Sequence, residues 1–211
     1  TPTANIIVNG TGRVFVKPDI ALVTLGADST KQTLADATAD VSKRISAVLA
    51  QVKGMGVSED DIKTTSYSIT PQYNQQRGSE TPSIIGYRVS NLVQVKVRKI
   101  DDVGKIVDAA VNAGANSLGG LYFTIDDSSK AEADARKLAV KNAMDKAKQL
   151  TDAAGVKLGD LNYISENLST PRPEVFRLAA AAPAADAGIG PVQSGQLEVS
   201  VTVEMHYTIS R

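Results

Sequence analysis

The feature that most constrains the fold of this chain is an internal repeat. The two copies are GMGVSEDDIKTTSYSITPQY (residues 54–73) and AAGVKLGDLNYISENLSTPR (residues 153–172). Each copy follows a helical pattern, carries Gly-Val at the joint, places an Asp before an aliphatic residue and then alternates until it reaches a proline. A change from helical periodicity to alternation is typical of a helix that leads into a strand. The repeat therefore predicts a duplicated helix-strand-strand unit.

Composition and charge exclude several classes of function. The 211 residues are 42% hydrophobic, which suits one large domain or two small ones. Lys plus Arg (23) equal Asp plus Glu (23), so the chain lacks the positive charge that drives binding to nucleic acid. The absence of cysteine excludes thiol catalysis, thiolate metal sites and disulfides.

The sequence shows no membrane span or leader. No apolar run approaches the roughly 20 residues that cross a bilayer. Thr1 opens directly into a strand-like segment, without a basic and apolar leader. We therefore expect that any export signal has been removed or never existed.

The first part of the chain alternates in the order of a split βαβ motif. Residues 4–28 predict two strands around Pro18, and the following helix is capped by Ser29 or Thr30 and ended by Gly54 or Gly56. Next come, in order, strand 62–73, strand 86–98, a helix that Asp101 or Asp102 caps and Gly114 closes, and strand 118–125. From residue 20 onward this is the strand and helix order of a ferredoxin-like layer.

The second part adds a helix and two strands. Asp126, Asp127 or Ser128 caps a helix over 129–154. Its predicted inner stripe is Ala135, Leu138, Ala139, Ala143, Ala147 and Leu150. Strands are predicted over 158–168 and 196–209.

We expect an α+β fold with largely antiparallel sheet covered by three helices. The chain is treated as one domain over 1–211, with subunits of approximately 1–125 and 126–211. Whether the two subunits share one sheet stays open at this point.

An Ala/Pro-rich loop over 169–195 joins the last two strands. A loop of this length is typical of either a mobile solvated segment or a functional arm. As an arm it would dock on another subunit or on a membrane surface. The predicted assembly contacts are Val175, Phe176 and Leu178.

The single histidine, His206, lies on the polar face of the strand 196–209. A metal site would require a second strong ligand at a fixed spacing, and none is present. We interpret His206 as a solvated strand residue. With no other histidine, a nucleophilic triad has no base.

Two acidic clusters, Glu59-Asp60-Asp61 and Asp126-Asp127, are the candidates for acid–base catalysis or for a hard cation. Each stands where a helix meets a loop, so helix capping and turn formation account for both. The glycines Gly10 and Gly12 open no helix, which argues against a phosphate loop, and we interpret them as a strand bulge.

A basic stripe, consisting of Arg88, Lys96, Arg98 and Lys99, follows one strand. We interpret it as a solvated sheet face, with an acidic partner surface as the alternative. No cofactor and no metal site is predicted.

Several segments resemble the SIMPL domain family. They include VNGTGRVFVKPDIALVTLG, DIKTTSYSITPQY, IIGYRVSNLVQVKVRKIDDVGKIVDAAVNAGA, LYFTIDDSSKAEADARKLAVKNAMDKAKQL and SGQLEVSVTVEMHYTI. The resemblance covers Ile6 to Ile209. Its most specific residues are the Gly-x-Gly before Pro-Asp, Pro71 with Tyr73, Gly86 with Tyr87, and Ala135 with Arg136.

The resemblance implies an exported bacterial protein, in the periplasm or associated with the outer membrane or cell surface. It implies an α+β fold without established enzymatic activity, and relatives that include immunogenic envelope proteins and ring-like oligomers. It offers no catalytic residues to transfer to this sequence.

Three functions follow, in order of preference. The first is a non-enzymatic, self-assembling scaffold or interaction protein of the cell envelope, a homo-oligomer with contacts to an envelope protein or a membrane surface. The second is a periplasmic module that binds a small ligand or a protein and is linked to stress response. The third is an enzyme that uses the carboxylates near Asp126 or Glu59.

Overall fold

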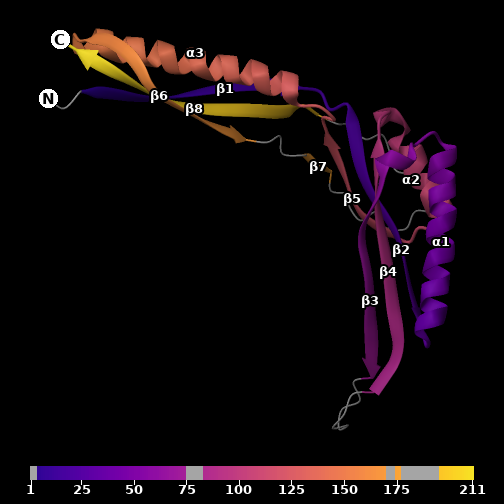
Figure 1. The fold of residues 1–211 in the computed structure, drawn as a ribbon. Helices are drawn as coiled ribbons and strands as arrows, with labels where there is room; N and C mark the ends of the chain where they lie inside the picture. The colour runs from indigo at the N-terminus through magenta and orange to yellow at the C-terminus, as the bar shows by residue number, and fades with distance from the viewer. Residues whose placement is uncertain (1–3, 75–82, 170–173, 177–194) are drawn as a thin grey trace. The chain divides into compact units, whose positions relative to one another are not determined.

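The computed structural model describes residues 4–74, 83–169, 174–176 and 195–211 of the chain. They form two antiparallel β-sheets covered by three α-helices, which confirms the expected α+β class (Figure 1). Backbone contacts divide the chain into two compact units, each with one of the sheets. With the units bounded in this way, rather than at residue 125, the two units do not share a sheet.

The five-stranded unit contains the ferredoxin-like part. Its elements are β2 (Ile20–Lys31), α1 (Leu34–Gly54), β3 (Ile62–Asn74), β4 (Ser83–Val97), α2 (Val103–Asn112), β5 (Ser117–Thr124) and β7 (Glu174–Phe176). The strand order is β3-β4-β2-β5-β7. β4 lies between β2 and β3, the two strands that α1 connects, and β2 lies between β4 and β5, the two strands that α2 connects. A split βαβ arrangement requires this order.

The three-stranded unit has the order β1-β8-β6. Its elements are β1 (Asn5–Val16), α3 (Ser129–Ala154), β6 (Lys157–Ser169) and β8 (Leu197–Ser210). Both ladders are antiparallel, and α3 lies along β1 and β8 on one face of the sheet (Figure 1).

The internal repeat corresponds to α1-β3-β4 in one unit and α3-β6-β8 in the other. In both copies the two strands pair with each other, and a further strand pairs with the second of them: β2 in the first copy and β1 in the second. The sequence grouped β1 with the residues before 125. The structure places it in the unit of α3, because β1 pairs with β8 along its whole length.

The core of the five-stranded unit is aliphatic. Alternate residues of β2 and β4 face the helices and are fully buried, as period-two alternation predicts. The main buried cluster includes Val23, Leu25, Val93, Val95, Val48, Val52, Ile106, Leu121 and Phe123. Burying each such side chain contributes about 1.5–3 kcal/mol.

The start of α1 differs from the prediction. Ser29 and Thr30 belong to β2, which continues to Lys31, so neither caps the helix. Thr33 is the N-cap, and its hydroxyl accepts a hydrogen bond from the backbone N–H of Asp36 at 3.1 Å. The strand continues because the Ser29 side chain is buried and bonded to the helix.

Gly10 and Gly12 form no bulge, and this part of the prediction is wrong. The ladder between β1 and β8 runs without a register shift. A methyl group at Gly10 would lie 2.1 Å from the Ala139 carbonyl oxygen, and one at Gly12 would lie 1.9 Å from that of Ala135. The glycines are therefore required so that the main chain of α3 can approach the strand.

The inner stripe of α3 is narrower than predicted. Ala135, Ala139, Ala143 and Ala147 are fully buried, as expected from their spacing. Leu138 and Leu150 lie beside this row and are 47% and 52% exposed. The helix backbone is too close to the sheet for leucine side chains to fit beneath it. None of the described helices combines the length and the apolar content that a membrane span requires.

Candidate functional site

The Asp126-Asp127 cluster organises the start of α3. The Asp127 carboxylate accepts hydrogen bonds from the backbone N–H of Ser129, at 2.9 Å, and from its hydroxyl. These bonds favour the ionised form and lower the pKa of Asp127. The Ser128 hydroxyl donates to Glu132 one turn further on. These are the contacts of a helix start, and the capping interpretation accounts for them.

The second acidic cluster makes ion pairs. Glu59 lies 3.1 Å from the Lys53 ammonium. The Asp61 side chain is only 5% exposed and accepts two bonds from the Arg98 guanidinium, at 2.7 and 2.8 Å. Lys96 lies 3.8 Å from the same carboxylate. Two residues of the predicted basic stripe, Lys96 and Arg98, thus balance the charge of the buried Asp61 carboxylate.

A cavity of about 240 Å³ lies beside this ion pair. Its walls combine Asp61, Lys96, Arg98 and Lys99 with apolar side chains that include Val57 and Ile106. An apolar lining with a few charged side chains is typical of a site that binds a small polar ligand. This is the site that the sequence analysis did not assemble, because Asp61 ends the short 3-10 helix before β3, whereas Arg98 follows β4, 37 residues further along the chain.

His206 has a partner that the sequence analysis missed. Its ring lies against that of Tyr163 in β6, with 4.5 Å between the ring centroids. Its Nε2 atom is 2.8 Å from a carboxylate oxygen of Glu204. Tyr163 is directly opposite His206 in the ladder of β6 and β8, a register that a single sequence does not reveal.

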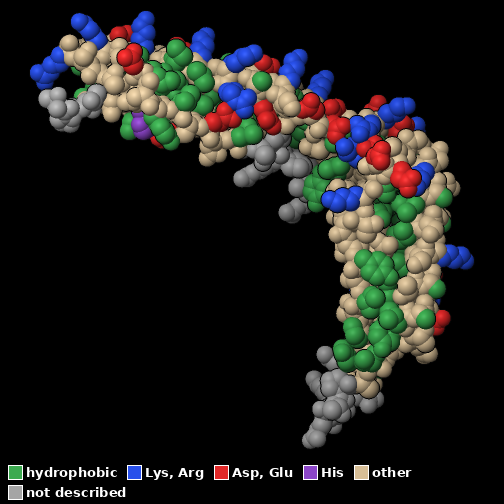
Figure 2. All heavy atoms as spheres, viewed as in Figure 1, with side chains coloured by type: hydrophobic (Ala, Val, Ile, Leu, Met, Phe, Trp, Pro, Cys, Tyr) green, Lys and Arg blue, Asp and Glu red, His purple; other side chains and the backbone are tan. Residues whose placement is uncertain are grey.

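The sheet face opposite α3 carries apolar side chains around His206. Ile7, the β1 residue opposite His206, is 58% exposed, and Tyr163 is 49% exposed. Phe15 of β1 is 60% exposed on the same face but lies opposite Glu198, at the other end of the strand. The histidine, purple in Figure 2, lies beside hydrophobic side chains. We refer to Ile7 and Tyr163, which lie on either side of His206, as the open-face patch. Exposed apolar groups on a regular sheet are typical of an interaction surface.

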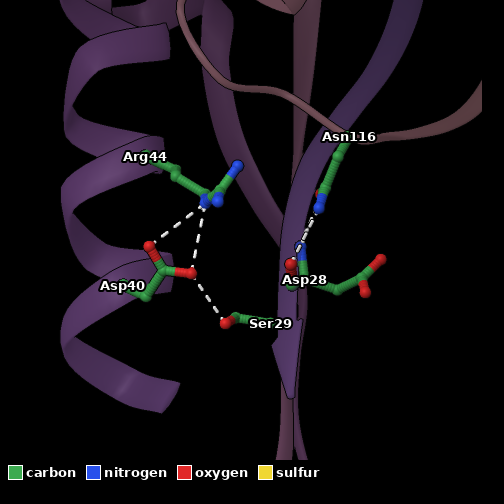
Figure 3. A network of polar contacts seen from close by, with 5 residues as sticks. All are labelled: Asp28, Ser29, Asp40, Arg44 and Asn116. Carbon is green, nitrogen blue, oxygen red and sulfur yellow. Dashed lines mark hydrogen bonds and ion pairs between the residues drawn. The ribbon is translucent and has the colours of Figure 1, made fainter. Parts of the chain in front are cut away.

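Two polar contacts tie β2 to its neighbours (Figure 3). Asp40 of α1 accepts a hydrogen bond from the Ser29 hydroxyl at 2.7 Å and lies 3.3 Å from the Arg44 guanidinium. These contacts lower the pKa of Asp40, the Ser29 bond most strongly. The Asn116 side chain bonds both the N–H and the C=O of Asp28, each at 2.8 Å. Both contacts hold β2 to neighbouring elements of the five-stranded unit.

The predicted assembly contacts fall partly outside the described residues. Val175 and Phe176 belong to β7, whose backbone pairs with Tyr122 and Leu121 of β5. Leu178 and most of the loop 169–195 lie outside the described residues. Within the described residues, no three His, Asp or Glu side chains are grouped closely enough to hold a metal ion.

Comparison with known proteins identifies the family. The model of the SIMPL family, described as proteins of unknown function (DUF541), matches residues 6–207. The chain belongs to the SIMPL family. The resemblance noted in the sequence is thereby confirmed.

Named relatives of this SIMPL chain are similar over most of its length. The 26 kDa periplasmic immunogenic protein of Brucella melitensis is 34% identical over 99% of this chain and 86% of that protein. The uncharacterized protein YggE of Edwardsiella ictaluri is 28% identical, covering 86% of this chain and 76% of that protein. YggE of Escherichia coli K12 is 26% identical, covering 80% and 68%.

The SIMPL chain thus presents two features that could serve function. One is the cavity beside Asp61, and the other is the open-face patch. Of the acids in the two clusters, Asp127 bonds the start of α3, and Glu59 and Asp61 form ion pairs.

Proposed function

We propose that this SIMPL chain is an exported, non-enzymatic protein of the cell envelope that acts by self-association and by contacts with envelope partners. The periplasmic name of the Brucella relative supports export to the periplasm. A place on the outer membrane or cell surface is the further part of this proposal. The SIMPL family and the relatives named above carry no enzymatic description.

The observation that carries this proposal is the open-face patch. One face of the three-stranded sheet is covered by α3, and the other presents Ile7 and Tyr163 at 58% and 49% exposure. Large apolar side chains at this exposure gain free energy when a second surface removes them from water. A homo-oligomer is the simplest arrangement that would cover them.

Light scattering coupled to size exclusion tests this proposal. We expect the chain to elute as an oligomer, and the double variant Ile7→Ser with Tyr163→Ser to shift toward the monomer. The matched control is Leu138→Ser with Leu150→Ser, which removes exposed leucines from α3 and should leave the mass unchanged. A chain that is monomeric at every concentration would remove the proposal of self-association.

The second candidate is a periplasmic binding module for a small ligand or a protein, linked to stress response. The cavity beside Asp61 and Arg98 favours it. Thermal unfolding in the presence of a panel of small carboxylates, amines and sugars tests this alternative. A melting-temperature shift that Arg98→Met abolishes would support a ligand at this site, and flat responses throughout would count against it.

A further inference from the structure

β3 is an edge strand of the five-stranded sheet and is unusually free of charge. No Asp, Glu, Lys or Arg occurs between Thr64 and Asn74. Tyr67 and Ile69 are 50% and 46% exposed. Figure 2 shows hydrophobic side chains gathered over β3 and β4. Proteins commonly protect such edges with charged side chains, and this strand has none over that stretch.

The hydrogen bonds of the sheet show which backbone groups of β3 face outward. The Asn116 side chain bonds the backbone N–H and C=O of Asp28 on the side of β2 that faces β5. The backbone N–H and C=O of the adjacent residue, Ala27, therefore point toward β4. Ala27 is paired with Asn91, whose backbone therefore faces β2. Asn91 is also opposite Tyr67, which must then direct its own N–H and C=O away from the sheet.

The same alternation directs the backbone groups of Ile69 and Pro71 away from the sheet. Proline has no N–H, and it occurs in edge strands where that position faces solvent. A register shift lies at the other end, between Thr64 and Ser66. The pairing edge is therefore limited to residues 66–70, and Ser68 is its centre.

The edge of β1 is different, because α3 covers its outward groups. The Thr11 N–H donates to the Asn142 side chain at 3.1 Å, and the Asn9 carbonyl accepts from Lys146 at 2.8 Å. Among the described residues, no side chain makes a corresponding hydrogen bond to the outward backbone groups of Tyr67 or Ile69. Within the described residues, α3 thus protects the edge of β1, whereas the edge of β3 is available for pairing.

We propose that β3 pairs antiparallel with β3 of a second copy, about a two-fold axis at Ser68. In this register Tyr67 is opposite Ile69 of the partner subunit, and the two residues exchange N–H···O bonds in both directions. The proposal rests on the self-association proposed above and names one interface for it.

Charge and symmetry favour a second copy as the occupant. Two copies of the uncharged β3 edge can pair without repulsion between like charges. A strand of another protein that carries charges would lose hydration against this edge without gaining an ion pair. The two-fold axis also places Tyr67 and Ile69 of both copies on one face, and aromatic and β-branched residues pair favourably across strands.

The chain has no cysteine, which permits a sharp test. In the proposed register Ser68 is opposite Ser68 of the partner subunit in a non-hydrogen-bonded pair, with Cα atoms about 4.5 Å apart. This separation suits a disulfide. The matched control is Ser66→Cys, exposed on the same strand, whose two copies would stand roughly 13 Å apart.

The experiment oxidises each single-cysteine variant with oxidised glutathione and follows the covalent dimer by non-reducing electrophoresis. We expect Ser68→Cys to cross-link at least about tenfold faster than Ser66→Cys, because only the former meets the disulfide distance. Equal rates, or no cross-linking of Ser68→Cys while the unmodified chain is oligomeric, would overturn this interface alone. An unmodified chain that is monomeric throughout would instead remove the self-association on which the interface rests.

A non-covalent readout checks the same register. Ile69→Lys places a charge on the edge and should weaken association at least about tenfold, because the two copies would bring like charges together. Val111→Lys is the control, since Val111 is 54% exposed on α2, a helix of the same unit and not a strand edge. Equal effects of the two variants would contradict pairing at the β3 edge.

Discussion

Gly12 of β1 lies directly against the main chain of Ala135 in α3. A methyl group at Gly12 would stand 1.9 Å from the Ala135 carbonyl oxygen and 2.5 Å from the Ala139 nitrogen. Both contacts are with backbone atoms of a helix, which cannot rotate away. The Gly-x-Gly motif of β1 is thus a packing requirement of the three-stranded unit.

Gly12→Ala is therefore expected to lower the free energy of unfolding by about 3 kcal/mol or more, since overpacking against a rigid backbone forces the helix from the sheet. Chemical denaturation of the two proteins measures the difference. Gly54→Ala is the control, because nothing lies within 4 Å of its added methyl group. Its effect should stay within about 1 kcal/mol and be stabilising. Similar losses at both positions would contradict the close-packing account.

The edge of β1 yields a second prediction. Replacing Asn142 and Lys146 by alanine removes the side chains that bond the Thr11 N–H and the Asn9 carbonyl. The exposed edge should then pair with other chains, and turbidity on heating should appear earlier. Lys141→Ala, an exposed lysine of the same helix, should leave aggregation unchanged. If the double variant behaves like that control, the edge is protected in another way.

The ion pair of Asp61 and Arg98 should respond asymmetrically to mutation. Asp61 is 5% exposed at its side chain, whereas Arg98 is 56% exposed. Arg98→Met leaves a buried carboxylate with only the more distant Lys96, and we expect a loss of about 2–3 kcal/mol. Asp61→Asn removes the ion-pair partner of Arg98, whose guanidinium water can still solvate. The free energy of unfolding should then fall by only about 1 kcal/mol. The reverse order, measured by urea unfolding, would show that the burial of Asp61 is not the dominant cost.

The contact between Arg136 and Glu166 predicts a dependence of stability on pH. The Arg136 guanidinium donates to both carboxylate oxygens, which lowers the pKa of Glu166 below its ordinary value of 4.5. The stabilisation is complete above that value and is lost as the pH falls through the lower pKa of the folded state. The difference in melting temperature between the wild type and Glu166→Gln should thus be constant near neutral pH and shrink in acid. A difference independent of pH would contradict this linkage.

The sequence predicted the elements better than their assembly. Alternation from Leu197 to Ile209 placed β8 and its buried face correctly, because a half-buried strand shows its period directly. The ferredoxin-like order also followed from the succession of periods. The pairing of β1 with β8 could not follow, since residues so far apart in the chain leave no local signal of their contact.

The errors share a physical cause, which is close tertiary packing. Leu138 and Leu150 were placed inward by helical spacing, but the approach of α3 to Gly10 and Gly12 leaves room only for alanines. The contact of His206 with Tyr163 required the register of two strands, and so did the outward direction of the Tyr67 backbone. These are the relationships from which the interaction surfaces arise.

Sedimentation velocity of the unmodified chain over a wide concentration range tests the central claim most directly. The chain has a mass of 22.2 kDa, and the account predicts species at multiples of this mass that shift toward the monomer on dilution. A single species of 22.2 kDa at every concentration would contradict it, because the open-face patch and the β3 edge would then remain uncovered.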